Sequence, residues 1–187
     1  MIIMYTEYDA VTGVLANYAR RLNQELGAAV SRLIAPPAAD AREAEVELAK
    51  NPSPFFFFGH GVRAGLIAQN LVTIDFNKTP HLLSGRVVCA TCCHSAAALK
   101  SAVGHGATVV GYDGFVAVFL IPPYSAMLED CLLAGPRELA RGGSAADAVR
   151  RTRGELRRAA RKLIAGPIED QVYAPFLEMN ANLVKEL

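Results

Sequence analysis

The 187-residue sequence lacks any long run of apolar residues. Its most apolar short stretch is Phe55–Phe58, whereas a helix that spans a membrane needs about 18 or more such residues in a row. The first five residues also lack the basic segment and the small-residue cleavage site of a secretory signal. We therefore expect a soluble, cytoplasmic protein with no membrane span.

Neither sign of charge is in excess, because 19 Lys and Arg stand against 18 Asp and Glu and leave a net charge of +1. A balanced chain has no overall attraction for nucleic acid or for an anionic membrane surface. Apolar residues make up 52% of the chain and charged residues 20%, a composition that excludes a disordered protein. The length fits a single domain, residues 1–187, with a buried core.

Cysteine is scarce, and three of the four cysteines crowd into one short segment. Such a cluster does not suit a disulfide framework, so we expect free thiols, metal ligands or one nucleophile with bystanders. Cys89 and Cys92 have the spacing of a redox motif. The side chains that could together enclose zinc are Cys89, Cys92, Cys93, His94 and His60. Structural zinc sites usually draw on a second, separate ligand pair, which is absent, and we expect no metal and no cofactor.

Apolar segments of strand length alternate with helical periodicity along the chain. The pattern predicts strands over Ile2–Thr6, Ala29–Ile34, Pro54–Phe58, Arg86–Ala90 and Ala107–Tyr112, with weaker signals over Leu71–Phe76 and Phe115–Ile121. It predicts helices from Asp9 to Leu26, from Asp40 to Lys50 and over Ser95–Val103, and two or three more toward the C-terminus. This alternation predicts an α/β fold, a three-layer αβα sandwich around a mostly parallel sheet.

Reactive side chains follow two of the predicted strands. Pro54–Phe58 is apolar throughout, which predicts a central strand covered on both faces, and Gly59-His60-Gly61 follows it. Thr91-Cys92-Cys93-His94-Ser95 follows the next buried strand. Because open parallel sheets bind ligands at the carboxyl ends of their strands, neighbouring strands would bring His60 and a cysteine to one crevice.

A cysteine and a histidine in one crevice suit nucleophilic catalysis. The thiolate is the reactive form of cysteine, and an imidazole can take its proton and later deliver it to a leaving amine. Cys93 would lie just before the helix over Ser95–Val103, whose N-terminal partial charge favours a thiolate. The amides of Gly61 and Cys93 could form an oxyanion hole. Cys92 is the rival nucleophile.

Both blocks resemble those of a known family. Phe56-Phe57-Phe58-Gly59-His60-Gly61 is similar to the strand and Gly-His-Gly block of the caspase-like cysteine peptidases, which include metacaspases, legumain-type enzymes, gingipains and the CHAT group. Cys92-Cys93-His94-Ser95 is similar to the metacaspase block in which Cys-His-Ser-Gly follows a buried strand, and that match implies that Cys93 is the catalytic nucleophile. Gly106–Gly111 and Gly143–Val149 resemble the back half of CHAT domains.

The resemblance implies a caspase-like fold, a thiol protease activity and a protein or peptide substrate. It also implies control by a regulatory protein partner or by dimerisation, in a defence or cell-death pathway. The chain departs from the metacaspase pattern at Thr91, where metacaspases have an Asp that helps to bind a basic P1 side chain, and at Ala96, where they have glycine.

We expect the enzyme to prefer a basic P1 side chain, which would need another carboxylate partner here. The residues that we expect around the S1 pocket are Glu7, Asp9, Thr91 and Asp113. The resemblance places the loop of residues 6–9 at the border of that pocket, and Asp113 ends the strand over Ala107–Tyr112. Asp9 could instead cap the first helix, and Asp113 could belong to a turn. A small or apolar P1 residue is the alternative, because an acidic one finds only Arg63 nearby.

Basic residues crowd one predicted helix near the C-terminus. They are Arg150, Arg151, Arg153, Arg157, Arg158, Arg161 and Lys162. The apolar stripe predicted for the same helix is Ala148, Val149, Thr152, Leu156, Ala159, Ala160 and Leu163. We interpret the basic face as solvated, with contact to an acidic partner as the alternative; no interleaved aromatic residues support nucleic-acid binding.

Two other functions stay open. One is a non-catalytic caspase-like interaction module that binds its partner through the basic helix. The other is a zinc or thiol-redox protein on an α/β scaffold.

Overall fold

A mixed, mostly parallel sheet forms the centre of the computed structural model, which describes residues 1–187. Its six strands have the order β2-β1-β3-β7-β8-β9, and only β9 is antiparallel to its neighbour. The strands are β1 (Ile2–Tyr5), β2 (Arg32–Ile34), β3 (Phe55–Phe58), β7 (Val87–Thr91), β8 (Thr108–Tyr112) and β9 (Val184–Glu186). The predicted α/β class and mostly parallel sheet are confirmed.

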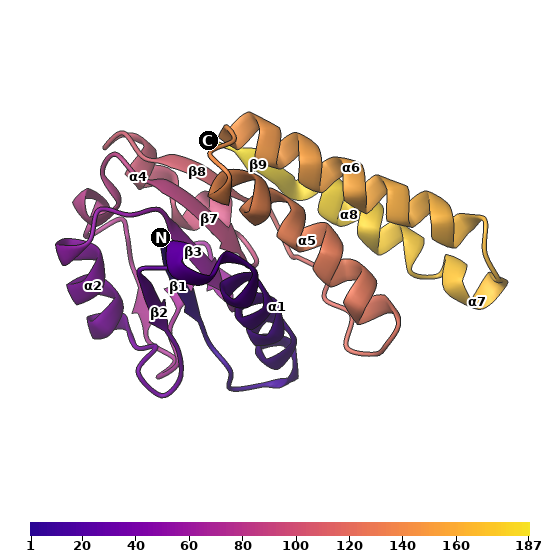
Figure 1. The fold of residues 1–187 in the computed structure, drawn as a ribbon, viewed down its shortest axis with the longest axis horizontal. Coiled ribbons are helices and arrows are strands. Elements are labelled where there is room, and N and C mark those ends of the chain that lie inside the picture. Colours follow the sequence, from indigo (N-terminus) through magenta and orange to yellow (C-terminus); the bar gives the residue numbers. More distant parts are fainter.

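Four helices cover one face of this sheet. They are α1 (Ala10–Leu26), α5 (Tyr124–Ala140), α6 (Ala145–Ile164) and α8 (Ala174–Leu183), and the short α7 (Ile168–Gln171) lies between α6 and α8. In Figure 1, α5, α6 and α8 run beyond the sheet, with α7 at their far end. None of the helices in the structure is both long and apolar enough to cross a membrane.

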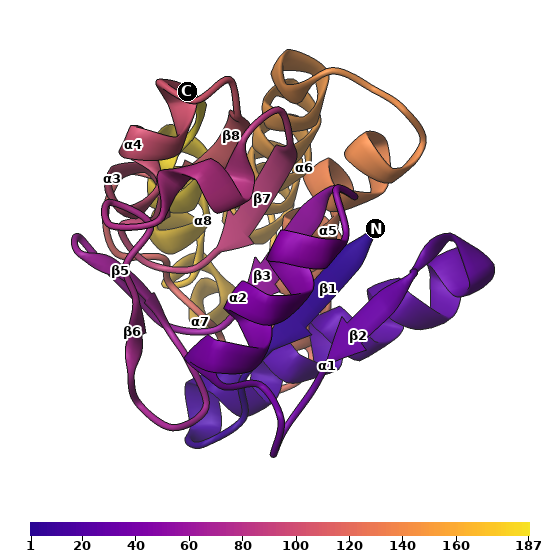
Figure 2. The ribbon, with the colours of Figure 1, turned by 90° about the vertical axis from the view of Figure 1, so that its left-hand side faces the viewer.

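Shorter elements cover the opposite face (Figure 2). They are α2 (Ala41–Lys50), α3 (Ser95–Ala98), α4 (Lys100–Val103), the 3-10 helix η2 (Pro80–Leu83) and a small antiparallel sheet of β4 (Gly61–Val62), β5 (Gly65–Ile67) and β6 (Thr73–Ile74). Another 3-10 helix, η1 (Gly27–Ala29), follows α1.

The four phenylalanines of β3 explain why this strand is central. Successive side chains of a strand point to opposite faces, so Phe56 and Phe58 join the core under α1 and α5, while Phe55 and Phe57 join the core under α2. None of the four is more than 1% exposed. The prediction of a strand that is buried on both faces is therefore confirmed.

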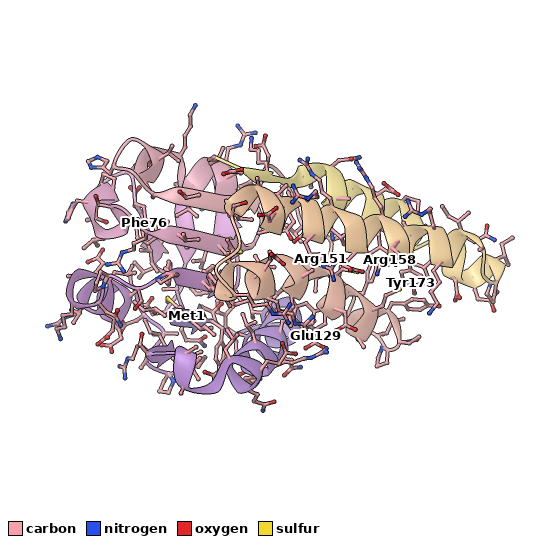
Figure 3. All side chains as sticks on the ribbon, turned by 45° about the horizontal axis from the view of Figure 1, so that its top comes forward. Met1, Phe76, Glu129, Arg151, Arg158 and Tyr173 are labelled. Atoms are coloured by element: carbon pink, nitrogen blue, oxygen red, sulfur yellow. The ribbon has the colours of Figure 1, made fainter.

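Side-chain caps begin the helices α1 and α6, and the cap at Asp9 is the one that the sequence predicts. Asp9 caps α1 by accepting the amide hydrogen of Thr12 at 2.8 Å, and Ser144 caps α6 by accepting that of Asp147 at 3.1 Å. All seven residues of the predicted apolar stripe of α6 are buried. Figure 3 shows Arg151 and Arg158 along the side of α6 next to α5, and both approach Glu155.

Two predicted elements are wrong in form. The helix predicted over residues 95–103 is broken at Leu99, whose backbone leaves the helical region and whose side chain is fully buried in the core. The strand predicted over Phe115–Ile121 is a loop, because the free edge of β8 is already paired with the C-terminal β9. The sequence pattern did not predict β9, β4 or β5.

Candidate active site

The ends of two adjacent strands bring His60 and Cys93 together. β3 and β7 are parallel neighbours, as predicted, with Phe58 paired to Thr91 at their carboxyl ends. The chain then continues to His60 from β3 and to Cys93 from β7. Both side chains line one cavity of about 160 Å³. Its other lining residues are Val11, Leu15, Gly59, Thr91, Cys92, Val116 and Val118.

Cys93 is the only cysteine that is not buried. Its sulfur accepts a hydrogen bond from the amide of Val116 at 3.3 Å. This amide is a hydrogen-bond donor at the atom that would carry the negative charge of a thiolate. The partial exposure of the side chain also leaves it accessible to a substrate. Access for a substrate and a hydrogen-bond donor at the sulfur are two of the properties that suit a nucleophilic cysteine.

The two other cysteines of the cluster point into the protein. Cys89 and Cys92 are 4% and 2% exposed. Burial raises the pKa of Cys89 to about 12, and it also raises the pKa of Cys92 well above its ordinary value. A thiol held protonated in the core is a poor nucleophile and a poor redox group. No set of three or more His, Cys, Asp or Glu side chains is placed so that it could hold a metal ion.

Asp9 positions the histidine. The Nε2 atom of His60 lies 2.7 Å from the Oδ2 atom of Asp9, and no other protein group hydrogen-bonds to the imidazole. Burial raises the pKa of Asp9, but the hydrogen bonds from the amide of Thr12 and from His60 lower it by more, so it lies below its ordinary value. An ionised carboxylate on Nε2 fixes the ring and leaves Nδ1 available for proton transfer.

The sequence predicted Asp9 as a helix cap or as an S1 residue but did not predict its contact with His60. The cap is confirmed. The chain order contains a signal for this contact. Asp9 follows β1, His60 follows β3 and Cys93 follows β7, and in the sheet β3 lies between β1 and β7. Residues that follow these three strands therefore share one edge of the sheet.

Gly61 packs against the backbone of the cysteine turn. A Cβ atom at this position would lie 2.7 Å from the sulfur of Cys92 and would collide with the carbonyl oxygen of Cys93. The amide of Ile67 donates to the carbonyl of His60 at 3.0 Å, so His60 is a residue of β4's edge whose backbone groups face β5. Successive residues of an antiparallel strand alternate in this respect, and the amide of Gly61 therefore points away from β5. The Cys93 amide makes no hydrogen bond within the chain. Of the two residues predicted for an oxyanion hole, Cys93 lines the cavity and Gly61 does not.

Buried Ser95 fixes the turn that carries Cys93. Its hydroxyl donates to the carbonyl of Ala90 at 2.9 Å and accepts the amide hydrogen of Tyr112 at 2.8 Å, which ties the end of β7 to β8. His94 has left-handed backbone, with φ of 53°, and its amide donates to the carbonyl of Gly114 at 2.7 Å. Because α3 has only four residues, the contribution predicted from its partial charge is small.

The residues predicted for the S1 pocket do not come together. Thr91 is 1% exposed and lines the cavity. Glu7 forms an ion pair with Arg20, and Asp113 forms one with Lys185 at 2.6 Å. None of the three carboxylates predicted for this pocket lines the cavity.

Comparison of the chain with protein-family models, with curated proteins and with solved structures found no match.

Proposed function

We propose that the protein is a caspase-like cysteine endopeptidase in which Cys93 is the nucleophile, His60 the general base and acid, and Asp9 the residue that positions His60. The observation that supports this most strongly is the shared cavity. His60 and Cys93 come from the ends of adjacent parallel strands, and both line it. The caspase-like fold is part of the proposal. It is supported by the mostly parallel sheet with helices on both faces and by the place of the two sequence blocks on it.

The first half of the reaction forms a thioester. His60 accepts the proton of Cys93, and the thiolate attacks the carbonyl carbon of the scissile peptide bond. The amides of Gly61 and Cys93 donate to the oxygen, on which negative charge develops. The intermediate then collapses, the C–N bond breaks, and the protonated imidazole delivers its proton to the leaving amine.

The second half of the reaction releases the acid product. His60, neutral again, takes a proton from a water molecule that attacks the thioester carbon. The C–S bond breaks, and the proton returns to the sulfur of Cys93. Asp9 stabilises the imidazolium at both stages, because it is an ionised carboxylate 2.7 Å from Nε2.

Digestion of a peptide library tests this function. The library is derived from a proteome, and new N-termini are identified by mass spectrometry after incubation with wild type, Cys93→Ala or His60→Ala. We expect one set of cleavage sites that disappears in both variants. No cleavage by any of the three, or the same cleavage by all three, would favour the non-catalytic interaction module. In either function, a regulatory partner or dimerisation is a further part of the proposal.

A further inference from the structure

We propose that the cavity beside Cys93 receives the P1 side chain of the substrate and selects an uncharged, medium-sized aliphatic one; this rests on the proposed peptidase function. Four apolar side chains form its walls. Val11 and Leu15 come from α1, and Val116 and Val118 come from the loop between β8 and α5. The buried Thr91 and the backbone of Gly59 add no charge.

The absence of a carboxylate from these walls excludes a basic P1 residue. A cation that leaves water for an apolar cavity needs an anionic partner there. Glu7 and Asp113 are paired with Arg20 and Lys185. Asp9 is bonded to His60, and its diversion to a substrate cation would release the imidazole that it positions.

An acidic P1 side chain is excluded by the same argument with the signs reversed. The only lining residue that can carry a positive charge is His60. In the proposed reaction His60 must first accept a proton from Cys93. The anionic partner of the imidazolium is already Asp9, so a substrate carboxylate would be buried in the cavity without a cation of its own.

The size of the cavity sets the upper limit of the side chain. The volume is about 160 Å³, and an apolar cavity of about 150 Å³ in another protein holds one benzene molecule. Part of the present cavity borders Cys93 and His60 and must also admit the scissile carbonyl. Side chains of three or four heavy atoms, those of Val, Leu and Met, therefore fit, and an indole does not.

The position of the cavity identifies the substrate residue that enters it. The sulfur-bearing Cys93 is itself one of the walls. In a peptide, the Cβ atom of the P1 residue is two bonds from the carbon that the sulfur attacks, whereas the Cβ atom of the following residue is three bonds away. The P1 side chain is therefore the one held nearest to the sulfur.

Peptide electrophiles that differ only at P1 test the proposal without a known substrate. The measurement is the second-order rate of modification of Cys93, followed by intact-protein mass spectrometry and peptide mapping. We expect the Leu, Val and Met probes to react about a hundredfold faster or more than the Arg, Lys, Asp and Glu probes. Iodoacetamide, which has no P1 side chain, measures the reactivity of Cys93 alone.

These reagents separate failure of the pocket from failure of the function. Faster reaction of Cys93 with the Arg or Lys probe than with the Leu probe would overturn the aliphatic pocket. The proposed peptidase function would still stand if the rate of that reaction fell in His60→Ala. Modification by iodoacetamide that is unchanged in His60→Ala would contradict the peptidase and the pocket with it.

A matched pair of variants tests the location of the pocket. Val118→Asp and Val118→Asn have side chains of the same shape, but only the first supplies a carboxylate to the cavity wall. We expect Val118→Asp to react with the Lys probe at least about tenfold faster than Val118→Asn does. Equal rates in two folded variants would show that the P1 side chain lies elsewhere. If Val118→Asp does not fold, the probe series on the wild type decides alone.

Discussion

The carboxylate of Asp9 joins His60 to the start of α1. Oδ2 lies 2.7 Å from the imidazole, and Oδ1 accepts the amide hydrogen of Thr12 at 2.8 Å. One side chain therefore satisfies a free amide at the helix terminus and orients the proposed base. Since β1, β3 and β7 are adjacent, the proposed positioning residue, base and nucleophile all follow neighbouring strands.

Asp9→Asn separates these two functions of Asp9. Asparagine caps helices about as well as aspartate, so we expect the free energy of unfolding to change by less than about 1 kcal/mol at neutral pH. An amide cannot stabilise the imidazolium as a carboxylate does, and we expect the rate of modification of Cys93 by a peptide electrophile to fall roughly 10- to 100-fold. Asp40→Asn is the matched control, because Asp40 caps α2 and lines no part of the cavity. An equal loss of rate in both variants would contradict the positioning role.

The lowered pKa of Asp9 predicts a pH dependence of stability. A carboxyl whose pKa is lower in the folded state stabilises the protein fully above its unfolded pKa, and this contribution is lost as the pH falls through the folded value. The ordinary value for Asp9 is 3.8. In urea denaturation we expect the stability of the wild type relative to Asp9→Asn to decrease as the pH falls below that value. A difference that stays constant down to about pH 3 would show that Asp9 has no stabilising partner in the folded protein.

Cys93 and Cys92 are expected to differ sharply on substitution. Cys93→Ala should abolish peptide cleavage and labelling by the electrophile. Cys92→Ala should keep most of both, because the sulfur of Cys92 lies in the core, and should cost about 1 kcal/mol of stability for one lost heavy atom. The measurements are cleavage of a library-derived peptide and thermal denaturation. An active Cys93→Ala and an inactive Cys92→Ala would mean that the nucleophile is assigned one residue too late.

Gly61→Ala is expected to disturb the site more than its size suggests. The added methyl group would collide with the carbonyl oxygen of Cys93, a backbone atom that cannot turn away as the end of a flexible side chain can. We expect a loss of about 1–3 kcal/mol of stability and of most labelling at Cys93. Gly154→Ala in α6 is the control, because its methyl group meets no atom within 4 Å and should stabilise the helix by about 0.5–1 kcal/mol. If the two variants have the same stability and the same labelling at Cys93, the close approach of residue 61 to the Cys93 turn does not require glycine.

The sequence predicted the parts of the site that depend on short buried strands. The run Phe55–Phe58 could form only a strand covered on both faces, and the reactive residues after it and after β7 had to lie at one sheet edge once the two strands paired. The nucleophile and base could therefore be proposed from local pattern and chain order.

The parts that the sequence did not predict depend on which segments become neighbours in space. The Asp9–His60 contact requires β1 to pair with β3, and no local pattern encodes that pairing. The loop over residues 115–121 has a strand-like composition, but β9 from the C-terminus occupies the edge where it would pair. The proposed P1 pocket likewise combines α1 with that loop. Tertiary pairing thus overrides local propensity at these places.

The most direct test of the central claim is the dependence of Cys93 reactivity on His60. Wild type, His60→Gln and His81→Gln are treated with limiting iodoacetamide at neutral pH, and the modified cysteine is located by peptide mapping. We expect rapid modification of Cys93 alone in the wild type and His81→Gln, since the other cysteines are buried. In His60→Gln we expect the rate to fall at least about tenfold. Equal rates in all three proteins, or modification mainly at another cysteine, would contradict the claim.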